Sequence, residues 1–537
     1  MSYVKHEYRE NDILYASQLN EMDDQIAKNE VDIQDLIDAV KKEGGYARYG
    51  VTGIGQAASE LTRIWDSVGM VAQVGTDGDV SGVINDFDAA KPFMRRKCVG
   101  EWNLVDGKAV FTVNAYLGDA NYTEDGSMGD YVAVECPLCY YYFDGSKLGV
   151  SVHPYDGWRA FDIFASGHDQ TKLLDKVYLP AYALAQDEQG KAVCLSGYLN
   201  CAGDYKSLMD AARTYKNGAL GGLAYLEPAA VNFYEWALFT VEFATQNCQN
   251  VMQGCCNLRQ NENDTLTFLD ATHAVASGWF TERVVGEHIC IMPTNMTYTS
   301  SAYKATHIIM ALDRCDQSGT PDTSGEYTLL SLDDLDAGYW EYDYTGETAY
   351  KIAARPYPTG ACNEVKTPSG SPVSNSDGMY PMRYRYRENV FGNQFRTAAD
   401  LFGLRVEDEK TYKIEYYFAT TPETLYPAKN IVNADLQTDA FEKLDIETPS
   451  SSYRNGYIKE REHSALYPDL WAPTNTGGSA STYTCDYASL ASSPVVRSVR
   501  LGGYWATGAF AGFSYFNAFP APSHSFAHSG GSLCFAQ

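Results

Sequence analysis

The spacing of hydrophobic residues changes along the chain and first predicts a helix at residues 17–42. Apolar positions there recur alternately every three and four residues, which is typical of a coiled-coil seam. Polar Asn29 interrupts the seam, and so narrow a stripe is expected to pair with copies of itself. The alternative is a single helix packed on its own domain, since short patterns of this kind also arise by chance. The seam positions are Leu19, Met22, Ile26, Asn29, Ile33, Leu36 and Val40.

The pattern then becomes strand-like, and residues 46–200 are predicted to form a β-rich domain. The sequence alternates on either side of Asp106-Gly107, a dipeptide typical of a tight β-hairpin turn. The run DYVAVECPLCYYYF at 130–143 is rich in β-branched and aromatic residues, as strands are. A short helix is expected near 59–67.

A third part, 201–537, mixes both patterns. Helices are predicted at 204–217 and 229–252, the second with apolar residues on one face. Strand-like runs separated by Ser, Pro and Gly suggest an insertion near 262–380. Together with an N-terminal coiled-coil helix at 1–45, these elements predict an α+β protein.

The last residues, 501–537, stand apart because they contain no Asp, Glu, Lys or Arg, although charged residues make up 20% of the chain. Their aromatic residues follow neither the strand nor the helix period. One interpretation is that they close a core. The other is a contact surface, because exposed Tyr, Phe, Ser and His are typical of binding sites.

Composition and charge narrow the function classes. A chain of 537 residues is long enough for large cores, and its net charge of −28 argues against nucleic acid or anionic membranes as direct ligands. Charges in the N-terminal MSYVKHEYREND argue against a signal peptide, and no apolar run is long enough for a membrane span. The 13 cysteines, an odd number, indicate buried thiols rather than a disulfide framework.

No catalytic motif stands out. The nine histidines lack metal-ligand spacing, and no nucleophile elbow or phosphate-binding loop is present, so we expect neither a metal nor another cofactor. Cys136 and Cys139 form a lone CxxC, for which zinc binding is the less favoured interpretation. Glu235 and Glu242 fall on nearly the same side of their helix, and we interpret them as solvated or structural. A carboxylate pair for glycoside cleavage, assembled from distant parts of the fold, stays open.

The tail LGGYWATGAFAGFSYFNAFPAPSHSFAHSGGSLCF (501–535) resembles the variable region of diversity-generating retroelement target proteins, a family of phage tail receptor-binding proteins typified by the major tropism determinant. Two further segments, ENVFGNQF at 388–395 and EWALFTVEFATQNCQ at 235–249, are similar to elements of the C-type lectin fold shared with formylglycine-generating enzymes. The resemblance implies that 201–537 is a C-type lectin-like domain.

The resemblance also implies a site and a function. A fixed frame, including Leu501, Trp505, Leu533 and Phe535, is expected to be buried. The variable positions are expected to bind a bacterial surface ligand, with Tyr504, Phe510, Phe516, Phe519 and Phe526 exposed. The full set is Tyr504, Ala506, Thr507, Phe510, Ser514, Phe516, Phe519, Pro520, His524, Phe526 and His528.

The expected protein is therefore not an enzyme but a homotrimeric adhesin, made in the host cytoplasm and carried on the virion tail with other tail proteins. Two alternatives are an enzyme on the same fold, either formylglycine-generating-like or a tail depolymerase, and a purely structural virion protein. For the first enzyme class, Cys485 and Cys534 are the nearest candidate pair, although their spacing gives no support.

Overall fold

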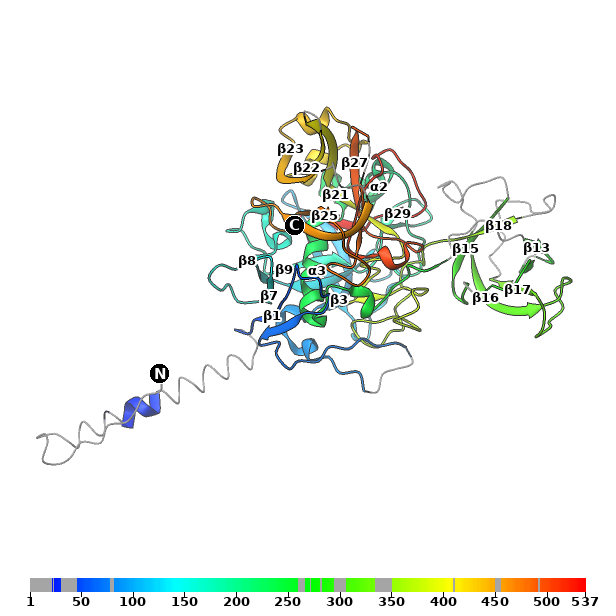
Figure 1. Cartoon of the computed structure of the whole chain (residues 1–537), viewed down its shortest axis with the longest axis horizontal. Coiled ribbons are helices and arrows are strands. Elements are labelled where there is room, and N and C mark those ends of the chain that lie inside the picture. The colour runs from blue at the N-terminus through cyan, green and yellow to red at the C-terminus, as the bar shows by residue number, and fades with distance from the viewer. Residues whose placement is uncertain are drawn as a thin grey trace, which may run out of the picture.

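The structure is a computed structural model, and its strands far outnumber its helices (Figure 1). The expected α+β class, with a coiled-coil helix and a separate C-type lectin-like domain, is therefore wrong. The described residues form β-sheets around one buried α-helix. One hydrophobic cluster joins buried residues from Ala47 to Phe535, and the strands between 266 and 354 have a cluster of their own. The structure describes residues 22, 24–29, 46–77, 82–258, 266–270, 272–280, 283–293, 306–333, 350–408, 411–449, 455–490 and 493–537.

Most of the predicted coiled-coil seam lies outside the described residues. Residues 24–29 are helical, and Met22 and Ile26 are exposed, with no second helix packed on them in the part of the chain described. The described residues therefore show no coiled coil.

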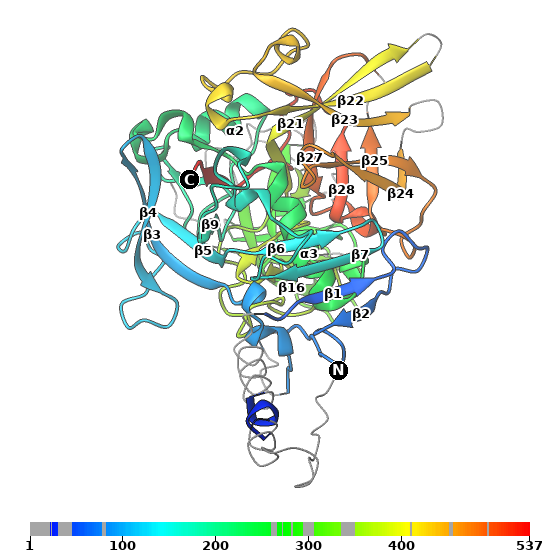
Figure 2. The same ribbon diagram turned by 90° about the vertical axis from the view of Figure 1, so that its left-hand side faces the viewer.

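A five-stranded sheet covers one side of the central helix, in the order β2-β1-β7-β6-β8 (Figure 2). Its strands alternate, so that Val51, Leu148 and Tyr141 point into the core while their neighbours face outward. The helix expected near 59–67 is wrong, because strand β2 occupies part of this segment. The bounds are β1 (Tyr49–Thr52), β2 (Thr62–Trp65), β6 (Tyr140–Phe143), β7 (Lys147–Ser151) and β8 (Arg159–Ala160).

A second sheet runs in the order β4-β3-β5-β9 and contains the predicted hairpin. Asp106 and Gly107 have φ angles of 50° and 78°, the left-handed conformation that this two-residue turn requires. The hairpin prediction is confirmed. The bounds are β3 (Arg96–Val105), β4 (Lys108–Tyr116), β5 (Tyr131–Pro137) and β9 (Lys176–Pro180).

The central helix is α3 (Ala229–Phe243), preceded by α2 (Tyr205–Ala212). Both helices were predicted with longer bounds. α3 ends where Ala244 adopts a left-handed conformation with φ 51°, so its expected extension to 252 is wrong. Because sheets pack on opposite sides of α3, even Glu235 and Glu242 are fully buried and pair with arginines. Their interpretation as structural residues is confirmed.

A large C-terminal sheet packs on the other side of α3, in the order β23-β22-β21-β27-β28-β26-β24-β25, and β29 pairs with β21. Asn232 of α3 donates a hydrogen bond to the Phe513 carbonyl in this sheet. The bounds are β21 (Phe395–Asp408), β22 (Thr411–Ala419), β23 (Phe441–Pro449), β24 (Asn455–His463), β25 (Trp471–Thr476), β26 (Tyr487–Leu490), β27 (Val496–Gly502), β28 (Gly512–Ala518) and β29 (Ser529–Gly530).

A small closed barrel extends to one side of the body, within the range of the expected insertion (Figure 1). Its strands are β13 (Leu266–Phe268), β14 (His273–Ala276), β15 (His288–Pro293), β16 (Thr306–Cys315), β17 (Tyr327–Leu332) and β18 (Tyr350–Ala354). Three short pairs complete the fold: β10 (Ala185–Gln186) with β11 (Ala192–Val193), β12 (Ala224–Leu226) with β30 (Leu533–Phe535), and β19 (Arg383–Tyr384) with β20 (Arg387–Glu388).

Candidate ligand-binding surface

The expected frame of the tail is buried. Leu501, Trp505, Leu533 and Phe535 all lie in hydrophobic clusters. Phe535 stacks on Trp102 of β3 with ring centroids 4.6 Å apart, so the chain end completes a core begun more than 400 residues earlier. This part of the prediction is confirmed.

The eleven expected contact residues divide by exposure. Phe510 and Phe519 are 41% and 50% exposed, and His524 is exposed as well. Tyr504, Ala506, Phe526 and His528 are half-buried. Thr507, Ser514, Phe516 and Pro520 are buried, so the prediction that these side chains form an exposed surface is wrong.

Strand alternation explains the burial of Ser514 and Phe516. Both lie on β28 and point toward the core, whereas the intervening Tyr515 points to the other face. Ser514 accepts a hydrogen bond of 3.1 Å from Arg461, and the Phe516 ring packs against Trp471 at 5.4 Å.

Thr507 and Pro520 shape the backbone instead. The Thr507 hydroxyl accepts a 2.7 Å hydrogen bond from the Tyr504 N–H and closes the turn before the short helix Gly508–Phe510. The Pro520 carbonyl accepts a 3.1 Å hydrogen bond from the N–H of Ser498 in β27. Variation at these two positions would alter the turn rather than the contact surface.

Three tail residues form an aromatic stack: Tyr504, His528 and Phe526. The His528 ring lies 4.4 Å from the Tyr504 ring and 4.9 Å from the Phe526 ring, at interplanar angles of 23° and 12°. Phe395 supports the stack from below, 5.1 Å from Tyr504. Burial, and then the charge of Arg500, lower the pKa of His528 to about 3, so its ring is neutral and stacks as an aromatic.

A second group surrounds Phe510, whose ring lies 4.4 Å from Tyr487 and 5.4 Å from Tyr457. Tyr515 connects this group to the stack. β26 and β28 are parallel with Ala488 opposite Phe516, which places Tyr487 and Tyr515 on the same face. We call the stack, Tyr515 and the Phe510 group the aromatic band.

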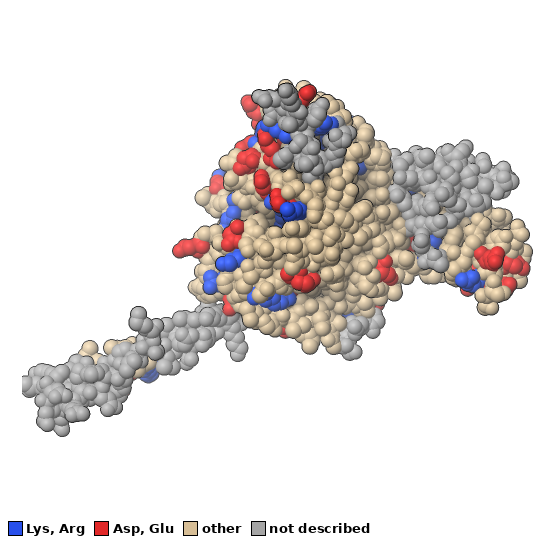
Figure 3. Space-filling model, viewed as in Figure 1, with Lys and Arg blue, Asp and Glu red and all other residues tan. Residues whose placement is uncertain are grey.

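Sequence reasoning missed Tyr457 and Tyr487, which lie outside the tail. Strand alternation was the available signal, but it does not reveal which distant strands become neighbours. Figure 3 shows an uncharged surface over the part of the body where Figure 1 places the red C-terminal segments. Apart from Tyr515, which is buried, the rings of the aromatic band are exposed or half-buried, and an uncharged surface of such rings is suited to contact binding.

Two buried arginines of β27 hold the loop that connects β28 to β29. Arg497 donates a hydrogen bond of 2.5 Å to the Phe519 carbonyl, and Arg500 donates one of 2.9 Å to the His524 carbonyl. Arg500 also lies 5.4 Å from the centre of the Phe526 ring. The loop therefore has a main chain held by hydrogen bonds, with the side chains of Phe519 and His524 exposed and that of Phe526 half-buried.

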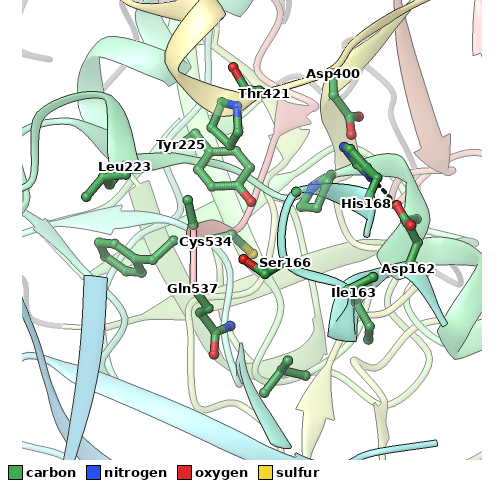
Figure 4. Close-up of a pocket in the computed structure, with 18 of the residues that line it drawn as sticks. Asp162, Ile163, Ser166, His168, Leu223, Tyr225, Asp400, Thr421, Cys534 and Gln537 are labelled. Atoms are coloured by element: carbon green, nitrogen blue, oxygen red, sulfur yellow. Dashed lines mark hydrogen bonds and ion pairs between the residues drawn. The ribbon is translucent and has the colours of Figure 1, made fainter. Parts of the chain in front are cut away.

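A cavity of about 300 Å³ lies on a different part of the body and is the candidate active site for the enzyme alternative (Figure 4). His168 lies there between Asp162 and Asp400. Its Nδ1 pairs with Asp162, and its Nε2 donates a 3.0 Å hydrogen bond to the Thr420 carbonyl. Because both ring nitrogens are engaged, the imidazole is held in place rather than free to act as a base.

The two candidate nucleophiles, Cys534 and Cys485, are not activated, because the pKa of each thiol is raised and the reactive thiolate is disfavoured. Cys534 lines the cavity, but burial raises the pKa of its thiol well above the usual value. Burial likewise raises the pKa of Cys485 to about 12. Cys136 and Cys139 are buried, and no group of three potential metal ligands gathers anywhere in the described residues.

Asp400, Asp469 and His168 are expected to contribute stability that is lost as the pH rises from about 4 to 7, whereas buried histidines such as His528 contribute in the opposite direction. Burial raises the pKa of Asp400 to about 6 and that of Asp469 to about 7. Burial lowers the pKa of His168, but its hydrogen bond to Asp162 outweighs this effect and the net pKa is raised. All three groups bind protons more tightly in the folded state, so the stabilisation is present at low pH and is lost as the pH passes the folded-state pKa values.

Calorimetric melting temperatures across this pH range test the expectation. Asp400→Asn keeps the oxygen that accepts the Ala229 N–H and should flatten the dependence. A difference in melting temperature between wild type and Asp400→Asn that stays constant or grows as the pH rises would contradict it.

Comparison with known proteins adds no assignment, since no protein-family model and no curated protein matches the chain. None of the described helices has the length and apolar composition needed to cross a bilayer.

Proposed function

We propose that this protein is a receptor-binding adhesin of a phage tail, and that its C-terminal aromatic band binds a ligand on the bacterial surface. The observation that carries the proposal is the way the tail is built. Half-exposed rings project from a backbone that Arg497 and Arg500 hold at the carbonyls. A rigid main chain with aromatic and small polar side chains gives contact area at low entropic cost.

The resemblance of the tail to retroelement variable regions supports the same proposal. Its exposed and half-exposed positions carry Tyr, Ala, Phe and His, all of which arise from asparagine codons by mutation of adenines. The adhesin would be made in the host cytoplasm and assembled with other tail proteins into the virion. Assembly as a homotrimer belongs to this proposal, because several copies raise the effective concentration of weak sites; light scattering measures it.

Substituting only the accessible contact set is expected to abolish labelling of bacterial cells. The set is Tyr504, Ala506, Phe510, Phe519, His524, Phe526 and His528, replaced by other residues that asparagine codons yield on adenine mutation. Fluorescent protein is applied to a panel of bacterial strains, and the strains that the wild type labels are counted by flow cytometry. At least a tenfold loss is expected, since contact residues of this type dominate binding energy.

A matched control replaces Tyr426 and Val432, which are each 56% exposed and lie outside the tail. This control should label cells as the wild type does. Unchanged labelling by the substituted tail, or no labelled strain in a broad panel, would overturn the proposal.

The retroelement part has its own test in the genome. A near-duplicate of the coding sequence for 501–535, differing only at adenines and lying beside a reverse transcriptase gene, is expected. Its absence would remove the variable-region interpretation but leave the cell-binding result standing.

A further inference from the structure

Four aromatic side chains form a second surface on the outer face of the β2-β1-β7-β6-β8 sheet, away from the tail. Figure 2 shows the strands of this sheet. We call Trp65, Trp158, Tyr142 and Tyr155 the tryptophan platform. The ring centroids of Trp65 and Trp158 lie 5.6 Å apart, Tyr142 lies 6.0 Å from Trp158, and Tyr155 lies 5.5 Å from it. All four side chains are half-buried, so each ring keeps accessible area.

Two paired glycines form the floor of this platform. Gly50 of β1 lies opposite Gly149 of β7. A Cβ atom at Gly50 would lie 2.6 Å from the Trp65 ring, and one at Gly149 would lie 2.3 Å from the Trp65 ring and 2.8 Å from the Trp158 ring. The two indole rings therefore lie directly against the main chain at Gly50 and Gly149. A side chain at either position would displace them.

The backbone of Trp65 is held in an unusual conformation to place its ring there. Its φ angle is 56°, in the left-handed region that bulky residues rarely occupy. Two hydrogen bonds with Arg48 fix this conformation. The Asp66 N–H donates a 3.0 Å hydrogen bond to the Arg48 carbonyl, and the Arg48 N–H donates a 2.9 Å hydrogen bond to the Asp66 carboxylate. Strain of this kind is concentrated at binding and catalytic sites.

The indole N–H groups of the platform remain available to a ligand. No described residue accepts a hydrogen bond from the indole N–H of Trp65 or Trp158, whereas the hydroxyls of Tyr142 and Tyr155 donate to Asp144 and to the Tyr46 carbonyl. Charged residues lie next to the rings. Asp66 follows Trp65 in the sequence, Asp156 follows Tyr155, and both are exposed. The exposed Arg48 has its guanidinium 5.1 Å from the centre of the Trp65 ring. The surface thus combines flat apolar area with donors and acceptors at its edge.

We infer that the tryptophan platform binds the sugar rings of an uncharged polysaccharide. A pyranose presents an apolar C–H face, which stacks on an aromatic ring, and an edge of hydroxyl groups, which pair with indole N–H, carboxylate and guanidinium groups. A net charge of −28 disfavours a polyanionic chain. The two tilted indoles, with an interplanar angle of 45°, offer faces to successive rings of one chain.

This site is independent of the aromatic band, because α3 lies between the two supporting sheets. Arg63, next to the platform on β2, reaches inward and donates a 2.9 Å hydrogen bond to the Val241 carbonyl of α3. In an adhesin, a glycan contact here would add to receptor binding at the tail by raising effective concentration. The inference does not require the proposed function to be correct.

Affinity electrophoresis in gels that contain dextran, galactomannan, xyloglucan or soluble N-acetylglucosamine oligomers tests the inference. We expect the wild-type chain to be retarded by at least one of these, and Trp65→Ala with Trp158→Ala to weaken that binding at least tenfold. Trp158→Ala alone, outside the strained turn, should give a smaller loss and guards against a variant that fails to fold. Trp279→Ala is the matched control, a half-buried tryptophan of the barrel stacked on Arg314.

Three outcomes would overturn the inference: no retardation of the wild type, equal retardation of the double variant, or retardation lost to the same extent in Trp279→Ala. A change in oligomeric state of the double variant without glycan binding would instead place a second copy of the chain on this face. The tail substitutions distinguish the two proposals. If the tail substitutions leave cell labelling unchanged while the platform variants lose glycan binding, the proposal that the tail binds cells is wrong and the glycan-binding inference is supported.

Discussion

Phe516→Ala is expected to lower the free energy of unfolding by about 3–5 kcal/mol, although this residue belongs to the predicted variable set. Its side chain is 0% exposed and packs between Tyr416 and Trp471 on the core side of β28. Truncation removes buried apolar area and leaves a cavity that the surrounding close-packed side chains cannot fill. Chemical denaturation monitored by tryptophan fluorescence measures the change.

Phe510→Ala serves as the matched control, because Phe510 is the same residue type in the same segment but is 41% exposed. Its removal should cost less than about 2 kcal/mol, because it loses only its ring contacts with Tyr487 and Tyr457 at an exposed position. Equal losses for the two variants would contradict the division of the tail into supporting and contact residues.

Arg387→Met is expected to destabilise the fold by about 3–5 kcal/mol, the usual cost of removing one partner from a buried ion network. Arg387 donates hydrogen bonds to Glu227 and, at 2.8 Å, to Glu235 of α3. Burial alone would raise the pKa of Glu235, but Arg95 and Arg387 outweigh it and lower the pKa. Without Arg387, these carboxylates stay buried with less compensation.

The pH dependence of this variant is a second measurement. Weaker pairing raises the folded-state pKa of Glu235, so the deficit relative to wild type should shrink as the pH falls from about 7 to 5. Arg96→Met is the control, since the Arg96 side chain is 57% exposed and its pair with Glu135 should contribute less than about 1 kcal/mol. A deficit that grows at lower pH would contradict the assignment of Arg387 as the compensating charge.

Local patterns in the sequence predicted local structure well. Asp106-Gly107 predicts its hairpin because the turn's geometry depends on those two residues alone. The apolar face around Phe233 and Trp236 predicts that α3 exists and is buried, but its end at Ala244 is set by tertiary packing against Ser59 and Leu61. The α+β class was wrong because it gave too much weight to predicted helices, whereas strands predominate in the described residues and the helical pattern at 17–42 lies mostly outside them.

The candidate surface was predictable only in part. The absence of charge in 501–537 indicated a special segment, and Phe510, Phe519 and His524 are exposed as expected. Ser514 and Phe516 were predicted to be exposed because their residue types fit the variable positions of the resembled family. Strand alternation in β28 instead directs both side chains to the core. Tyr487 joins the band through the parallel pairing of β26 with β28, and Tyr457 through the antiparallel pairing of β24 with β26. No local pattern specifies either contact.

The tryptophan platform was missed for a similar reason. Gly50 and Gly149 lie far apart in the sequence, and their role as a floor follows only from the pairing of β1 with β7. The left-handed conformation of Trp65 has no sequence signature, because residues of this type usually avoid it.

The arginines under the tail loop have a consequence for how the protein tolerates change. Arg497, Ser498 and Arg500 donate hydrogen bonds to the carbonyl groups of residues 519, 520 and 524, and every amino acid possesses such a group. New residues at 519 and 524 would therefore inherit the same main-chain path whatever their side-chain chemistry. The chain could serve as a frame for a randomised library in which specificity is altered while folding is left to residues that never vary.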